Sequence, residues 1–153
     1  MLAHVIEAGP EHLPTISERL RAIDAHDLWE ASGMTPIEAL HYSMHVSVYS
    51  WVWNIDGEPA CVFGLAAPSL ISACAMPWLI TTTAVEQRPI EFLRGSRRML
   101  ATMLRLYPAL EGYVDARYHV SMQWLRWLGF TIHDAEPMGP LQTPFHRFEI
   151  GRT

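Results

Sequence analysis

The feature that most constrains the fold is the segment of residues 109–134, ALEGYVDARYHVSMQWLRWLGFTIHD. A short apolar run from Leu110 to Val114 is followed by a polar turn and then by an aromatic-rich amphipathic stretch. That stretch stops at Gly129, a residue type that commonly ends helices, and Phe130 begins a second apolar run. The pattern predicts a strand, a helix and a strand, and therefore a sheet with a helix packed on it.

Composition indicates one folded domain over residues 1–153. The length lies within the usual range for one domain, and half of the residues are hydrophobic while 18% are charged, which excludes global disorder. No linker, low-complexity tract or repeat interrupts the chain. The net charge of -5 argues against a general nucleic-acid binder, which needs a basic excess.

The sequence carries no signal for export or membrane insertion. The first residues lack a basic segment followed by a long apolar one, and no apolar run reaches about 18 residues. The two cysteines, Cys61 and Cys74, lie in apolar runs without metal-ligand spacing, so we expect buried, reduced thiols. Together these observations predict a cytoplasmic protein without a membrane span.

Turn and cap signals place the other elements. Thr35-Pro36-Ile37-Glu38 is a capping box with proline at the first helical position, and Asp56-Gly57 between two β-rich runs predicts a hairpin turn. The remaining expected helices are residues 11–31, 36–45 and 89–106. The remaining expected strands are residues 2–7, 46–55, 59–66, 76–85 and 145–150, the last after a loop at 137–144. The fold class is α+β, with a mixed, mostly antiparallel sheet of about six to seven strands and about four helices.

This order of elements resembles the GNAT superfamily of N-acetyltransferases over nearly the whole chain. The most specific motif is residues 114–130, VDARYHVSMQWLRWLGF, with its helix, Leu-Gly-Phe and strand. More narrowly, WLITTT (78–83), FLRGSRRML (92–100) and WLRWLGFTI (124–132) are similar to a GNAT-like group of tailed bacteriophages and prophages, which includes internal virion and morphogenesis proteins. The resemblance implies acetyl-CoA as cofactor and an amine as acceptor.

Two positions depart from the family pattern. The glycine-rich turn that binds the pyrophosphate of acetyl-CoA through backbone N–H groups is replaced by residues 86–95, EQRPIEFLRG. Pro89 removes a donor there, and Glu86 and Glu91 add negative charge. In the last helix, Leu125 occupies the position where many family enzymes keep a tyrosine that protonates the leaving thiolate.

Cofactor contacts are expected, by resemblance, at the end of the fourth strand and in the helix that follows. A local group of arginines could replace the missing backbone donors by charge-assisted contacts. The same group could equally be a solvated helix face. The expected cofactor residues are Ile80, Thr81, Thr82, Arg88, Arg94, Arg97 and Arg98.

The candidate catalytic residues are Glu86 and His119 as bases and Tyr118 as an acid. Acyl transfer to an amine requires proton removal from the ammonium group and protonation of the thiolate. Each residue also has a structural alternative, since Glu86 suits a solvated turn, His119 a helix cap region and Tyr118 core packing.

By resemblance, Tyr42, His45 and Trp51 line the acceptor groove. Trp51 and Trp53 alternate with Val52, so both face the same side of the sheet, where they could instead pack in the core. His41 and His45 share a helix face without a third ligand, and no metal site is expected.

Two functions follow from these observations. The first is an acyl-CoA-dependent N-acyltransferase, encoded by a phage or prophage, with a degenerate pyrophosphate loop. The alternative is a non-catalytic GNAT-fold phage protein, virion-associated or acting on the host, that self-associates or binds protein partners through its aromatic-rich surface. Topology favours the enzyme, while the missing glycines and tyrosine favour the alternative.

Overall fold

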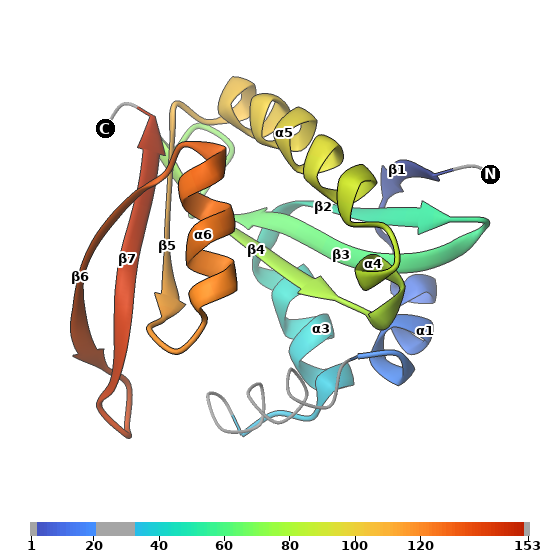
Figure 1. The fold of residues 1–153 in the computed structure, drawn as a ribbon. Helices are drawn as coiled ribbons and strands as arrows, with labels where there is room; N and C mark the ends of the chain where they lie inside the picture. The colour runs from blue at the N-terminus through green and yellow to red at the C-terminus, as the bar shows by residue number, and fades with distance from the viewer. Residues whose placement is uncertain (1–2, 21–32, 152–153) are drawn as a thin grey trace. The chain divides into compact units, whose positions relative to one another are not determined.

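The computed structural model describes residues 3–20 and 33–151, which form two compact units. The first comprises Met1–Ala67 and Trp78–Phe92, and the second Pro68–Pro77 and Leu93–Thr153. In hydrogen-bonding order the strands run β1-β2-β3-β4-β5-β7-β6 (Figure 1). Seven mostly antiparallel strands with helices in an α+β arrangement confirm the predicted fold class.

The first unit is a strand meander with two helices on one face. Its elements are β1 (Ala3–Glu7), the 3-10 helix η1 (Pro10–His12), α1 (Leu13–Glu18), α3 (Pro36–Val46), β2 (Ser47–Ile55), β3 (Glu58–Ala66), the second half of β4 (Cys74–Thr81) and α4 (Thr83–Glu86). Strands β1, β2 and β3 pair antiparallel, Val52 opposite Val62. These two valines form a buried core with Leu13, Ile16 and Leu40 of the helices, because alternation points them to that face.

Local sequence signals account for the ends of several of these elements. The Thr35 hydroxyl accepts a hydrogen bond from the Glu38 amide at 3.4 Å while the Glu38 carboxylate accepts one from the Thr35 amide at 3.1 Å, which confirms the capping box. Asp56 and Gly57 adopt φ values of 52° and 82°, as the two central residues of a type I′ hairpin turn must.

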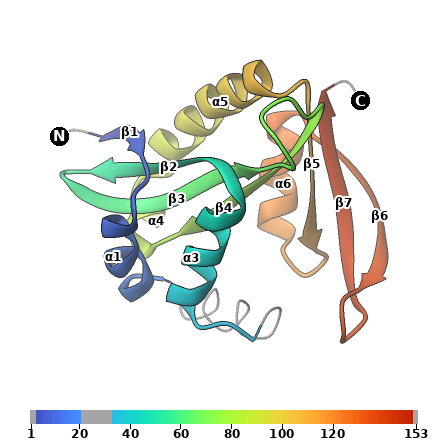
Figure 2. The ribbon, with the colours of Figure 1, turned by 180° about the vertical axis from the view of Figure 1, so that it is seen from behind.

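The second unit is a sheet with one helix against it. Its elements are the first half of β4, most of α5 (Pro89–Leu106), β5 (Ala109–Asp115), α6 (His119–Leu128), β6 (Thr131–Met138) and β7 (Thr143–Gly151). Strand β5 runs parallel to β4 and antiparallel to β7. Figure 2 shows α6 beside the β5-β7-β6 sheet from behind. Gly129 ends α6 with φ 107°, so the predicted strand-helix-glycine-strand unit is confirmed.

Three predicted boundaries were wrong. The strand expected at 76–85 ends at Thr81, because the Thr82 side chain caps a short helix instead of continuing the β-branched run. Half of the loop expected at 137–144 is strand, and residues 139–142 connect β6 and β7, since Pro137 and Pro144 face each other where neither needs an N–H donor. The helix expected at 11–31 is α1, which ends at Glu18, and residues 21–32 lie outside the described residues.

Gly64 is required by a close approach in the first unit. A Cβ placed there would lie 2.5 Å from the Tyr49 carbonyl oxygen and 2.8 Å from the Trp78 indole nitrogen. The same indole N–H donates to the Ser47 hydroxyl at 2.6 Å, and that hydroxyl donates to the Ser43 carbonyl at 2.6 Å. The absence of a side chain at Gly64 therefore leaves room for the Trp78 indole, which stabilises the junction between α3 and β2 through these hydrogen bonds.

We expect Gly64→Ala to lower the free energy of unfolding by about 1–3 kcal/mol, because the added methyl group must displace backbone. Gly95→Ala is the matched control. No atom lies within 4 Å of a Cβ at Gly95 inside α5, so alanine there should stabilise the helix by about 0.5–1 kcal/mol. Urea denaturation measures both, and equal effects of the two substitutions would contradict the close-approach argument.

Candidate functional site

The turn after β4 is held in place by Thr82, whose side chain is fully buried. Its amide and its hydroxyl both donate to the carbonyl of Ala60, at 3.0 and 2.6 Å. The hydroxyl also accepts the amide of Ala84 at 3.3 Å and so caps α4. Of the other predicted cofactor residues in this strand, Thr81 is its last residue, and Ile80 packs against the core of the first unit.

The amides of this turn are used within the protein. Those of Thr82 and Thr83 donate to the carbonyls of Ala60 and Arg19, and those of Ala84, Val85, Gln87 and Arg88 donate inside the turn itself. A turn that binds a pyrophosphate group must point free N–H groups outward. The turn at residues 82–88 instead closes on itself as a capped helical turn, and Glu86 is exposed at its end.

Arg88 is engaged with two carboxylates. Its guanidinium lies 3.5 Å from the Asp56 carboxylate and 3.1 Å from that of Glu91, and only 15% of the side chain is exposed. These contacts tie the β2-β3 hairpin to the start of α5. An incoming anion would have to compete with both carboxylates for this charge, so Arg88 serves as an internal tie in this structure.

The predicted acceptor residues divide between a helix surface and an aromatic face. Tyr42 and His45 are exposed on α3. Trp51 stacks between Tyr49 and Phe63, at centroid distances of 5.8 and 5.7 Å. Trp53, on the same side, lies 6.2 Å from Phe92. The predicted common orientation of Trp51 and Trp53 is confirmed, because Val52 between them packs into the opposite face.

The end of β5 and the start of α6 bring together an ion pair and two candidate catalytic residues. Asp115 is buried, and its carboxylate accepts the guanidinium of Arg117 at 2.7 Å and the Arg117 amide at 2.9 Å. These contacts, against the opposing effect of burial, hold the pKa of Asp115 below its usual range. Tyr118 follows as the N-terminal cap residue of α6, half-buried, and His119 is exposed in the first turn.

Leu125 is a core residue of the second unit. It is buried with Met122 on the inner side of α6. Its carbonyl accepts the amide of Phe130 at 3.0 Å, which completes the cap around Gly129. Leu125 is therefore used for packing in this structure.

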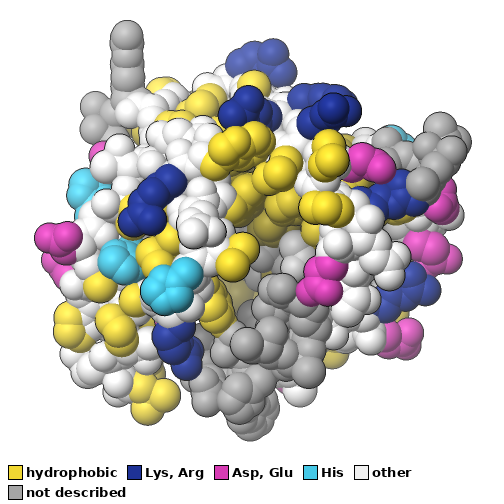
Figure 3. Space-filling model, viewed as in Figure 1, with side chains coloured by type: hydrophobic (Ala, Val, Ile, Leu, Met, Phe, Trp, Pro, Cys, Tyr) yellow, Lys and Arg dark blue, Asp and Glu magenta, His cyan; other side chains and the backbone are white. Residues whose placement is uncertain are grey.

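Exposed arginines form a stripe on α5. Arg94, Arg97 and Arg98 project from the helix surface, and Figure 3 shows basic side chains gathered along the upper edge of the molecule, where Figure 1 places α5. The Arg97 guanidinium lies over the ring of Trp127 in α6, 3.9 Å from its centroid. This cation-π contact orients Arg97 before any ligand arrives.

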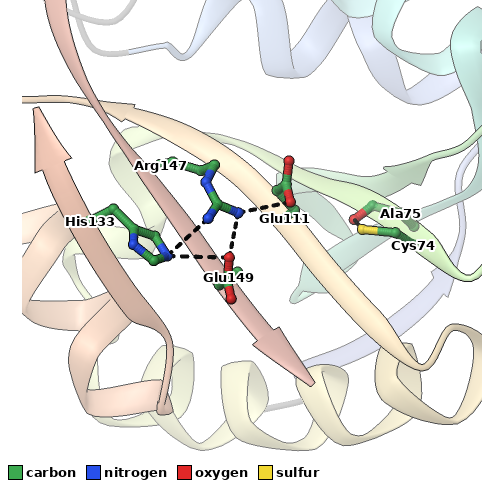
Figure 4. Close-up of polar contacts among 6 residues, drawn as sticks. All are labelled: Cys74, Ala75, Glu111, His133, Arg147 and Glu149. Carbon is green, nitrogen blue, oxygen red and sulfur yellow. Dashed lines mark hydrogen bonds and ion pairs between the residues drawn. The ribbon is translucent and has the colours of Figure 1, made fainter. Parts of the chain in front are cut away.

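The structure contains a charged network that the sequence did not indicate. Figure 4 shows Arg147 between Glu111, Glu149 and His133 on β5, β7 and β6. Arg147 lies 3.0 Å from Glu111 and 3.2 Å from His133, and it also pairs with Glu149. The sequence does indicate that Arg147 and Glu149 share one face of a strand, because they alternate with the buried Phe148. It does not indicate their partners, because Glu111 and His133 lie on neighbouring strands that are distant in the sequence.

The cysteine thiols are poorly suited to nucleophilic chemistry. Burial raises the pKa of Cys61 to about 12. Partial burial, with the negative charges of Glu111 and Glu149, raises the pKa of Cys74 as well. The prediction of free cysteines holds, although Cys74 is only partly buried. Among residues 3–20 and 33–151, no cluster of three or more His, Cys, Asp or Glu side chains could hold a metal ion, and no helix could cross a membrane.

Comparison with solved structures identifies the fold. An acetyltransferase of the GNAT family from Streptococcus pneumoniae superposes with a TM-score of 0.65 at 13% identity, covering 99% of this chain and 100% of that one. Ard1 from Thermoplasma volcanium gives 0.72 at 13%, covering 100% and 99%. RimL, a ribosomal L7/L12 alpha-N-protein acetyltransferase in complex with coenzyme A, gives 0.73 at 10%, covering 97% and 93%. No protein-family model and no curated protein matches the sequence.

The chain therefore has the fold of the GNAT N-acetyltransferases along its whole described length. At this level of identity the likeness establishes the fold, and the chemistry rests on the residues of this chain. The resemblance predicted from the Leu-Gly-Phe motif is confirmed at the level of fold.

The buried Asp115 gives a pH-dependent test of the β5-α6 junction. Because the folded pKa lies below the unfolded value of about 3.9, the carboxylate contributes stability that is complete above that value and is lost as the pH falls through the folded pKa. We expect Asp115→Asn to lower the free energy of unfolding by about 1–2 kcal/mol at neutral pH. This effect should shrink as the pH falls below the unfolded pKa and disappear once the pH has passed through the folded pKa.

Urea unfolding between neutral pH and acid measures this difference. Arg117→Gln is the control, because it removes the charge partner and should weaken the pH dependence attributable to Asp115. A difference between wild type and Asp115→Asn that stayed constant into acid would show that charge plays no part in the junction.

Proposed function

We propose that this protein is an acyl-CoA-dependent N-acyltransferase. The observation that carries the proposal is the match of the entire chain, over nearly the full length of the compared proteins, to structures named as N-acetyltransferases, one of them in complex with coenzyme A. The acceptor is then an amine. Tyr42, His45 and Trp51 are the proposed acceptor-groove residues, drawn from α3 and β2.

The cofactor would be held in an unusual way. The turn at residues 82–88 does not fit a pyrophosphate group in the usual manner, because its amides are bonded to protein and Arg88 is paired. We place the phosphate contacts instead on Arg94, Arg97 and Arg98, whose guanidinium groups can donate two parallel hydrogen bonds to a phosphate. In this sense the pyrophosphate loop is degenerate.

Proton transfer requires groups other than the missing tyrosine. Glu86 carries an exposed carboxylate able to accept a proton, and His119 carries an exposed imidazole. Tyr118 is the proposed acid because its hydroxyl is the phenolic donor closest in sequence to the start of α6. Leu125 can do neither, so an active enzyme of this design relies on these groups or on solvent.

Acetyl-CoA binding tests the enzyme proposal. A ligand that binds only the native state adds about 2.7 kcal/mol of stability at 100 times its Kd, and a protein of this size gains about 2–4 °C in melting temperature per kcal/mol. We expect a rise of several degrees at millimolar acetyl-CoA, and thiol release when an amine acceptor is added. Arg94→Gln with Arg98→Gln should reduce the rise by more than half, while Arg105→Gln with Arg126→Gln, an equal charge change outside the proposed cofactor residues, should leave it intact.

No melting shift at millimolar acetyl-CoA would refute this proposal. Binding without thiol release across a panel of amines, peptides and polyamines would support a coenzyme-binding protein without transferase activity.

A second candidate is a non-catalytic GNAT-fold protein of phage origin that works through protein contacts. Two observations favour it, the internally bonded turn after β4 and the burial of Leu125 where an acid would stand. The phage assignment rests on the sequence resemblance of residues 78–83, 92–100 and 124–132. This candidate requires self-association or co-purification with virion proteins, so a monomer absent from particles would refute it.

A further inference from the structure

We propose that α5 and α6 form a docking surface for single-stranded nucleic acid, centred on the stacked pair Arg97 and Trp127. This inference goes beyond the acyltransferase proposal and does not depend on it. The surface, called here the arginine stripe, comprises Arg94, Arg97, Arg98 and Arg105 of α5 with Arg126 and Trp127 of α6.

The charge of the stripe is one-sided. Residues 93–106 and 119–128 contain five arginines and no aspartate or glutamate. All five arginines are exposed. The one acidic residue of these two helices, Glu91, lies in the first turn of α5 and pairs with Arg88. The acidic total of the whole chain therefore conceals a surface with five exposed arginines, the local property that phosphate binding requires.

The arginines of α5 lie in one row. At about 100° per residue, Arg94, Arg97, Arg98 and Arg105 fall within an arc of about 100°, and they extend for about 16 Å along the axis. Phosphates along one stacked strand are about 3.4 Å apart along its axis, so the row spans four or five nucleotides. Thr102 accepts a hydrogen bond from the Arg105 guanidinium at 3.2 Å, which orients the far end of the row.

The contact between Arg97 and Trp127 distinguishes a nucleic acid from other anions. Trp127 covers one face of the Arg97 guanidinium, and the Arg97 side chain is exposed to solvent. We expect a flat, unstacked base to stack on this pair. Trp127 is itself 42% exposed. Acidic peptides and phospholipids offer negative charge without a stacking ring. The centre of the row carries the small exposed Ala101, and the exposed aliphatic side chain on this face of α5, Ile90, lies at its start, one turn before Arg94. Vesicle binding is therefore one of the outcomes that the test below includes.

Fluorescence anisotropy with a labelled oligoadenylate of about 12 nucleotides tests the proposal on the intact protein. With five phosphate contacts, the logarithm of the association constant should fall against the logarithm of salt concentration with a slope of about -3.5, which is about a 100-fold loss between 50 and 200 mM salt. An abasic strand of equal length should bind more weakly, because it keeps the phosphates and lacks the bases.

Two variants separate this surface from the proposed cofactor contacts. Arg105→Gln with Arg126→Gln should reduce the slope to about -2.1 while leaving the acetyl-CoA affinity unchanged, since neither residue belongs to the proposed cofactor set. Trp127→Leu should bring the affinities for oligoadenylate and abasic strand closer together. Arg19→Gln, which removes one positive charge from the first unit, is the control for a charge lost outside this surface and should change neither quantity. Circular dichroism melting verifies that each variant is folded.

Several results would overturn the proposal. These are no oligonucleotide binding at 50 mM salt, an unchanged slope in Arg105→Gln with Arg126→Gln, and equal affinity for oligoadenylate and the abasic strand. Displacement of the oligonucleotide by polyglutamate at equal charge concentration would also overturn it, as would preferential binding to vesicles of phosphatidylglycerol.

Discussion

The two hydrogen bonds from Thr82 to the carbonyl of Ala60 determine how the region after β4 is built. They pin the end of β4 to β3 in a site without solvent access, where a lost partner would leave a buried polar group unsatisfied. The threonine hydroxyl then caps α4, and the amides behind it close on nearby carbonyls. This anchor sets the positions of the amides of Thr83, Ala84, Val85, Gln87 and Arg88, all of which donate to acceptors within the protein.

The same region shows why most of the fold, but less of the candidate site, could be predicted from the sequence. Signals that act over three or four residues were read correctly, such as the Thr35 capping box, the Asp56-Gly57 turn and the glycine that ends α6. Thr82 was misread because a run of three threonines followed by alanine and valine has the composition of a strand. Its bond to Ala60 spans 22 positions in the sequence, and no local pattern announces it.

Side-chain pairing explains most of the remaining difference between expectation and structure for the candidate site. Arg88 was expected at the cofactor, and that role stays a prediction. In the structure its guanidinium pairs with Glu91 and with Asp56, a residue brought near by the hairpin. The network around Arg147 draws on three strands whose register the sequence does not encode locally. Partners of this kind become visible only when the strand pairing is known, because opposite charges on neighbouring strands need not be close in sequence.

Positive charge in this protein is therefore divided between two uses. All eleven lysine and arginine residues are arginines. Arg88, Arg117 and Arg147 form ion pairs with carboxylates of the same unit. The arginines of α5 face solvent, and the one carboxylate of α5, Glu91, pairs with Arg88 at the start of the helix. A guanidinium binds phosphate in a planar, two-pronged manner and stacks on rings, which a lysine ammonium cannot do. A helix face that only contacts solvent does not require planar, two-pronged binding or ring stacking. Of these two properties, the contact between Arg97 and Trp127 already uses ring stacking.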